Sequence, residues 1–186
     1  MKKLHSKIKI VGIILCAVLS IMLTSCGIKP KGIHGTELLK LADNQLYEKV
    51  YFQTLDLVES YSDEEIALSK ISPEIKTVYI LSIYDMEIQN GGLCQFFVNS
   101  SRLLAPYVDE CLQTINAQEH KKLLYDFVAN NNIDLKHLES FEIEDINEYA
   151  AQTMRYDFDA FDNAYIELTP LQDYIVSYIK DNISAF

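Results

Sequence analysis

PEIKTVYILSIYDMEIQN, residues 73–90, is apolar around almost its whole circumference when it is wound into a helix. A helix of that kind leaves no broad face for water and usually lies at the centre of a protein. Ser72 precedes Pro73, which supplies an N-cap residue and then a proline for the first turn. The segment therefore predicts a central helix around which other helices pack.

Helical signals continue on both sides of this segment. Ser62-Asp63-Glu64-Glu65 has the order of a capping box, and Thr169-Pro170 resembles the start at Ser72. Further helices are predicted over three ranges, Ala105–Ile115, Gln118–Ala129 and Ile143–Leu168.

The last helix has one apolar face, because an apolar residue recurs every four positions at Leu171, Ile175, Ile179 and Ile183. No segment shows the alternation of a strand with turn residues at its ends. The sequence predicts an all-α fold, with a single compact multi-helix domain of seven or eight helices over residues 36–186.

The segment after the central helix mixes polar side chains with a pair of glycines. Its six candidate site residues are Glu87, Asn90, Gly91, Gly92, Gln95 and Asn99. One interpretation is a tight helix corner, in which Asn90 and Gln95 bond to the free amides of the second helix. The other is a polar pocket in which Glu87 and those amides face a small ligand.

The pattern Glu-x-x-Asn-Gly-Gly-x-x-Gln-aromatic-Phe-x-Asn-Ser in residues 87–100 resembles the signature of the bacterial DNA-mimic protein family. Similarity extends over about Pro73–Ile183 and includes Phe158–Tyr165, which resembles an aspartate- and aromatic-rich helix of that family. Arg102 stands where the family usually has glycine.

The resemblance implies an all-helical domain with an acidic surface. One type of member is described as a mimic of double-stranded DNA that occupies the DNA-binding face of a transcription factor, whereas most members have no assigned activity. We carry over the fold and the acidic binding surface, and not the transcription-factor target.

The N-terminus predicts export. Lysines precede an apolar run of about 14 residues, which is short of the roughly 20 that a spanning helix needs. Leu23-Thr24-Ser25-Cys26 follows and resembles the lipoprotein signal of bacteria. We expect a signal peptide over residues 1–25, lipidation of Cys26 and a flexible tether over residues 26–35. The expected location is the extracytoplasmic side of a membrane in the cell envelope.

Charge restricts the choice of partner. The whole chain carries 16 basic and 27 acidic side chains, and cleavage before Cys26 would leave 12 basic ones and a net charge of −15. Direct nucleic-acid binding requires the opposite sign. Residues 139–173 hold ten of the acidic side chains, among them Asp157, Asp159 and Asp162, and only one basic side chain. They predict either a solvated helix face or a surface for a basic protein.

Catalytic motifs are absent from the sequence, so we expect no enzyme, no cofactor and no metal ion. Glu119-His120-Lys121 is expected to be an exposed helix start. Cys94 and Cys111 permit either a disulfide or two small buried side chains, and the family's core alanine at the second position favours the latter.

The favoured function is a lipid-anchored acidic module that binds a basic protein. The alternatives are an immunity protein, tethered at the membrane against a toxin, and a small-ligand receptor that uses the polar groups around the double glycine.

Overall fold

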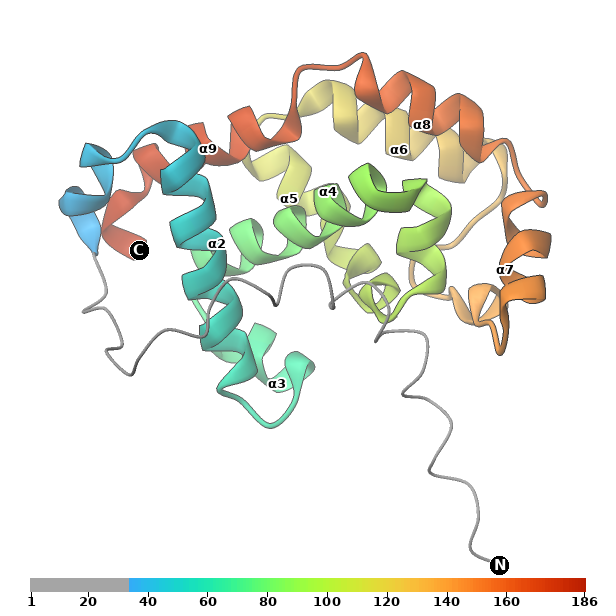
Figure 1. The fold of residues 1–186 in the computed structure, drawn as a ribbon, viewed down its shortest axis with the longest axis horizontal. Coiled ribbons are helices and arrows are strands. Elements are labelled where there is room, and N and C mark those ends of the chain that lie inside the picture. The colour runs from blue at the N-terminus through green and yellow to red at the C-terminus, as the bar shows by residue number, and fades with distance from the viewer. Residues whose placement is uncertain (1–33) are drawn as a thin grey trace, which may run out of the picture. The chain divides into compact units, whose positions relative to one another are not determined.

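The computed structural model describes residues 34–186, and within them every regular element is a helix (Figure 1). The eight α-helices are α2 (Asp43–Glu59), α3 (Glu64–Lys70), α4 (Pro73–Val98), α5 (Ala105–Thr114), α6 (Gln118–Asn130), α7 (Ile146–Thr153), α8 (Phe158–Ile166) and α9 (Leu171–Asp181). Four short 3-10 helices accompany them: η1 (Gly35–Lys40), η2 (Ser100–Leu104), η3 (Glu139–Phe141) and η4 (Ile183–Ala185). The predicted all-α fold is confirmed.

Helix α4 is the central element, as its sequence predicts. It contacts α2, α5, α7, α8 and α9, and Figure 1 shows it between α2 and α9 on one side and α8 on the other. Fifteen of its residues are buried. The hydroxyl of Ser72 accepts a hydrogen bond from the amide of Ile75 at 3.3 Å, which confirms the predicted cap.

The two ends of the described chain meet. The amide of Gly35 donates to the terminal carbonyl of Phe186 at 3.2 Å, so η1 lies against η4. Lys180 of α9 also pairs with Asp43 of α2 at 2.6 Å. The predicted signal peptide, Cys26 and nearly all of the predicted tether lie outside the described residues.

Two predicted helix starts need correction. The cap of α3 is Asp63 and not Ser62, because the Asp63 carboxylate accepts from the amides of Glu65 and Ile66 at 2.9 and 3.1 Å. Helix α9 begins after Pro170 without a side-chain cap, so Thr169 does not repeat the role of Ser72.

The helix predicted over Ile143–Leu168 is two helices, α7 and α8. Asp145 caps the first and Asp157 caps the second, where its carboxylate accepts from the amide of Ala160 at 3.1 Å. Aspartate is unfavourable inside a helix, because its side chain bonds to nearby backbone groups, and it is favoured at the N-cap. A new helix therefore begins after Asp157, although the apolar pattern of the sequence continues through it.

An aromatic cluster joins the C-terminal helices to α4. Phe97 of α4 packs on Phe158 of α8 with ring centroids 6.3 Å apart, and Phe158 packs on Phe127 of α6 at 5.3 Å. Cys94 in α4 and Cys111 in α5, the two cysteines among residues 34–186, are free and buried. Burial raises the pKa of the Cys94 and Cys111 thiols to about 11, as expected for small core side chains.

Candidate functional site

Among the candidate residues at the double glycine, Gln95 and Asn99 both donate hydrogen bonds to Glu87. One oxygen of the Glu87 carboxylate accepts from the side-chain amides of Gln95 at 2.7 Å and Asn99 at 2.8 Å, and the other accepts from the hydroxyl of Ser101 at 2.8 Å. Glu87 precedes the kink in α4 and its three donors follow it. The carboxylate therefore ties the second arm of the helix to the first.

The kink depends on the glycines. Gly91 and Gly92 depart from helical geometry, with φ/ψ of −160°/22° and 77°/178°. The second combination is one that essentially only glycine adopts. A Cβ at Gly92 would also lie 2.0 Å from Oδ2 of Asp162, so both the backbone and the space require glycine there.

The free amide after the kink is bound by a residue distant in sequence. Oδ1 of Asp162, in α8, accepts from the amide of Leu93 at 2.9 Å. From the sequence, Asn90 and Gln95 were expected to bind the free amides of the second helix. Instead, Gln95 binds Glu87, and Asn90 is exposed. Burial raises the pKa of Asp162 despite that hydrogen bond. The corner interpretation accounts for these contacts without a ligand.

Arg102 takes part in the same corner. Its guanidinium donates to the carbonyls of Val98 and Asn99 at 3.2 and 3.0 Å. These carbonyls have no partner within the helix because α4 ends there. It also pairs with Glu142 at 2.6 Å. The arginine that replaces the family's usual glycine thus caps the helix and binds the loop before α7.

The acidic residues of 139–173 differ in the contacts that they make. Asp145, Asp157 and Asp162 accept hydrogen bonds from backbone amides and shape the fold. Others are exposed and accept no side-chain hydrogen bond or ion pair in the described part of the chain, among them Asp159, Glu167 and Asp173.

Residues 34–186 contain all 27 acidic side chains and ten of the basic ones. Among these residues, only four carboxylates pair with a lysine or arginine: Asp43, Asp109, Asp126 and Glu142. Arg155, the one basic residue of 139–173, instead donates to the carbonyl of Ser140 at 3.1 Å and lies over the Phe141 ring. The surface therefore keeps a strongly negative potential.

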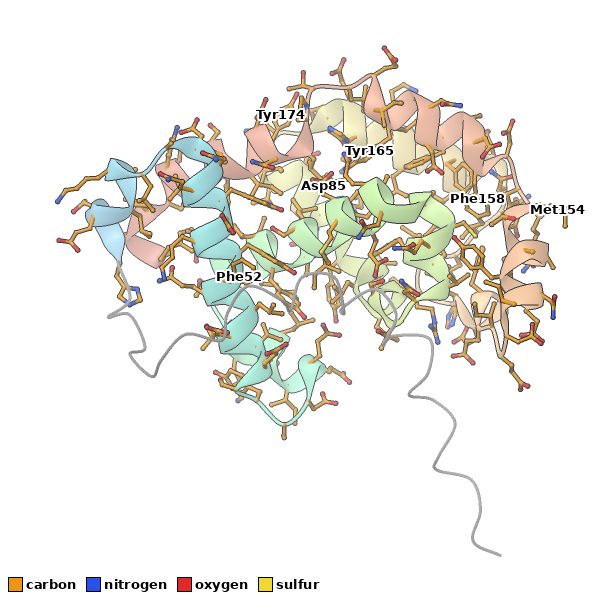
Figure 2. The ribbon with its side chains drawn as sticks, viewed as in Figure 1. Phe52, Asp85, Met154, Phe158, Tyr165 and Tyr174 are labelled. Atoms are coloured by element: carbon orange, nitrogen blue, oxygen red, sulfur yellow. The ribbon has the colours of Figure 1, made fainter. Side chains whose placement is uncertain are left out.

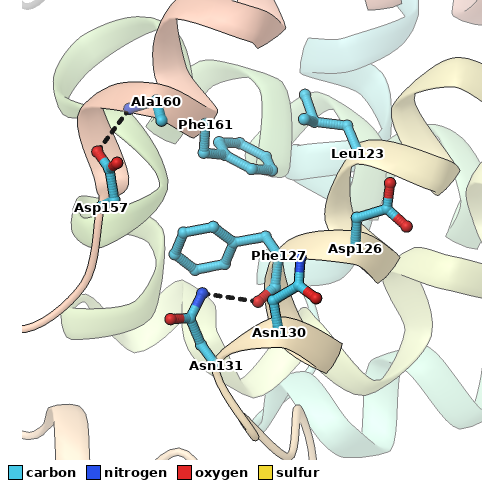
Figure 3. A pocket seen from close by; sticks show the side chains of 8 residues that line it. All are labelled: Leu123, Asp126, Phe127, Asn130, Asn131, Asp157, Ala160 and Phe161. Carbon is cyan, nitrogen blue, oxygen red and sulfur yellow. Dashed lines mark hydrogen bonds between the residues drawn. The ribbon is translucent and has the colours of Figure 1, made fainter.

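An open cleft of about 270 Å³ lies between α6 and α8 (Figure 3). Phe127 and Phe161 form its apolar wall, with ring centroids 5.4 Å apart. The carboxylates of Asp126 and Asp157 lie on opposite sides of the rings. Of the candidate residues from the sequence, Asp157 alone lines it.

A buried polar cluster joins α4, α6 and α8. The hydroxyl of Tyr165 donates to Asp85 at 2.8 Å, and the ring of His120 packs edge-on against Tyr165 at 4.8 Å (Figure 2 labels Asp85 and Tyr165). His120 is 1% exposed and its Nε2 lies 2.8 Å from the carbonyl of Thr169. The expectation of an exposed histidine was therefore wrong, because the residue's position on α6 faces the core.

Burial raises the pKa of Asp85 and lowers that of His120, so the interior disfavours charge on both. The sequence contained one signal for this cluster, which is an aspartate in the middle of an otherwise apolar helix. Nδ1 of His120 and the hydroxyl of Tyr84 have no partner within residues 34–186.

Neither a metal site nor a membrane span is apparent in the described residues. No three His, Cys, Asp or Glu side chains converge there as ligands. None of the helices in residues 34–186 combines the length and apolar character needed to cross a bilayer.

These features define a class: an acidic, all-helical protein in which most carboxylates of residues 34–186 do not pair with a lysine or an arginine. The chain matches the DMP19-like protein family over residues 69–182, which is more than half of its length. It therefore belongs to that family, the DNA-mimic family that the sequence resembles. No curated protein and no solved structure matches the chain. Helix α2 and most of α3 precede the matched range.

Proposed function

We propose that the protein is a lipoprotein of the cell envelope whose acidic helical domain binds a basic protein and catalyses no reaction. The observation that carries the proposal is the imbalance of charge, since only four of the 27 carboxylates in residues 34–186 pair with a lysine or arginine. Most of these carboxylates lie on helices. Such a surface attracts basic proteins and raises their association rate.

Family membership supports the same proposal, because the family is one of DNA mimics, and a mimic of DNA binds proteins that carry basic surfaces. The family is not known for catalysis.

The membrane anchor rests on the sequence around Leu23–Cys26. Two buried acyl chains hold a protein on a bilayer, whereas the acidic domain is itself repelled by anionic lipid. The proposal expects a mature chain that begins with an acylated Cys26. Mass spectrometry of the native protein tests it, and an intact Met1 or an unmodified thiol at Cys26 would contradict it.

Binding is tested with variants chosen from the structure. Asp157 and Asp162 are unsuitable for charge reversal because their carboxylates bind the backbone. The triple variant Asp159→Asn, Glu167→Gln and Asp173→Asn instead removes three exposed charges with no hydrogen bond to lose.

A matched control removes three exposed charges from α2, outside the family match, by Glu48→Gln, Asp56→Asn and Glu59→Gln. The protein is used to capture partners from an envelope extract, and the Kd of the purified partner is then measured at low and high salt.

We expect binding that weakens steeply with salt and weakens more in the first triple variant than in the control. Binding that is flat with salt would refute an electrostatic partner. Equal weakening in both variants would refute the assignment to residues 139–173.

A further inference from the structure

We propose that the cleft between α6 and α8 receives one lysine or arginine side chain of the basic partner. This inference rests on the proposed function and narrows it, because it assigns a contact of defined chemistry to two helices of the acidic surface.

The walls of the cleft suit the aliphatic part of such a side chain. Phe161 and Phe127 form the floor of the cleft, where they are 2% and 9% exposed, and the partly exposed Leu123 of α6 lies beside them. Long basic side chains bury their methylene groups on apolar surfaces and keep the charged head in water.

The rim of the cleft suits the charged head. Asp126 belongs to α6, and Asp157 precedes α8 on the other side of the rings. Oδ1 of Asp157 accepts from the amide of Ala160, whereas Oδ2 accepts no hydrogen bond within residues 34–186. A cation that reaches the rim at Asp157 therefore meets an available acceptor.

The chain's own Lys122 already shows the attraction of this rim for an ammonium group. Its Nζ pairs with Oδ2 of Asp126, four residues along α6. The Lys122 side chain is 74% exposed, so this ion pair is a weak one that a cation from a partner can replace.

The cleft has a volume of about 270 Å³. A single side chain that enters from a larger protein fits this space, and the remaining acidic surface then contacts the rest of the partner.

The test is an NMR titration of the ¹⁵N-labelled full chain, held in non-ionic detergent micelles. The probe is N-acetyl-arginine methylamide, and its neutral counterpart is N-acetyl-norleucine methylamide. We expect the cationic probe alone to shift the amides of Ala160 and Asn131 at millimolar concentration. Shifts spread evenly over the acidic surface, or equal shifts from the neutral compound, would overturn the proposal.

Two substitutions remove the rim charges and retain the fold. Asparagine caps a helix as well as aspartate does, so Asp157→Asn keeps the start of α8. Asp126→Asn and Asp157→Asn should each weaken probe binding by about threefold or more. The matched control Asp159→Asn, which lies outside the lining, should change it less.

A third substitution, Ala160→Leu, fills the cleft from the exposed face of α8 and should abolish the localised shifts. An unchanged affinity in this variant would overturn the proposal. Amide signals of α2, remote in sequence, confirm that each variant is folded.

Substitution of a lysine is expected to strengthen probe binding, whereas the aspartate substitutions weaken it. Lys122→Gln removes the internal competitor at Asp126 and should tighten probe binding. Lys121→Gln makes the same change of net charge one residue earlier, where the ammonium pairs with Asp109 at 3.1 Å, and serves as the control. Equal effects of the two substitutions would show that only net charge matters and would overturn the assignment of the cleft.

The captured partner separates this inference from the proposed function. If partner binding falls with salt but is unaffected by Ala160→Leu and Asp126→Asn, the cleft assignment is wrong and the acidic binding surface stands. If the probe binds in the cleft and no salt-sensitive partner exists, the proposed function fails and the cleft remains a site for cationic side chains.

Discussion

Replacement of Glu87 by alanine is expected to lower the free energy of unfolding by about 3 kcal/mol. The carboxylate accepts hydrogen bonds from Gln95, Asn99 and Ser101, so its removal leaves three donors without their acceptor. An orphaned buried polar group costs about 1–3 kcal/mol. Glu87 is only half-buried and water replaces part of each bond, so we take about 1 kcal/mol for each donor.

Urea denaturation followed by circular dichroism at the helical band measures this loss. The slope of the unfolding free energy against urea should stay unchanged while the midpoint falls. In a thermal scan, about 3 kcal/mol corresponds to a decrease in Tm of roughly 6–12 °C for a domain of this size.

Two controls define the cause. Glu87→Gln keeps one acceptor oxygen and should cost about 1 kcal/mol. Asn90→Ala changes another residue of the same motif, but Asn90 is exposed and has no hydrogen-bond partner among residues 34–186. Its effect should stay within about 0.5 kcal/mol.

A loss below about 1 kcal/mol in Glu87→Ala, with the fold intact, would refute the corner as a source of stability. Comparable losses in Glu87→Ala and Asn90→Ala would also contradict it, because only one of the two side chains takes part in the corner. The ligand interpretation of the motif would then become the better one.

Further predictions concern the kink, pH and the thiols. Gly92→Ala should cost at least about 2 kcal/mol in urea denaturation, and Asp162→Ala should recover part of it by removing the clash, as a double-mutant cycle would show. Burial lowers the pKa of His120 below its ordinary 6.5, so the unfolded chain takes up the proton first as pH falls. Stability should therefore decline below about pH 6.5, and less so in His120→Gln. Cys94 and Cys111 should react with a thiol reagent only as fast as the protein unfolds, and fast labelling of the native protein would contradict their burial.

Local patterns allowed much of the fold to be predicted. Ser72-Pro73 marks the start of α4, and the apolar circumference of residues 73–90 places that helix at the centre, because both effects act within a few residues. The double glycine likewise indicated a change of direction, which the structure has at Gly91 and Gly92.

Contacts between distant segments were beyond this reasoning. Asp162 binds the amide of Leu93 across 69 residues, and no spacing in the sequence relates the two. The burial of His120 depends in the same way on the carbonyl of Thr169, 49 residues away. The cleft between α6 and α8 was missed for the same reason, since its carboxylates come from separate helices.

The motif that indicates the family is thus a poor guide to the partner. Gln95 and Asn99 donate to Glu87, and Gly92 has no room for a side chain, so these residues are needed to form the corner. The carboxylates that we propose for partner binding lie elsewhere, on exposed positions of α8 and α9 and at the rim of the cleft. A protein with the same corner and different exposed charges would keep this fold and select another partner. Partner choice should therefore be sought by varying the exposed carboxylates while the corner is held constant.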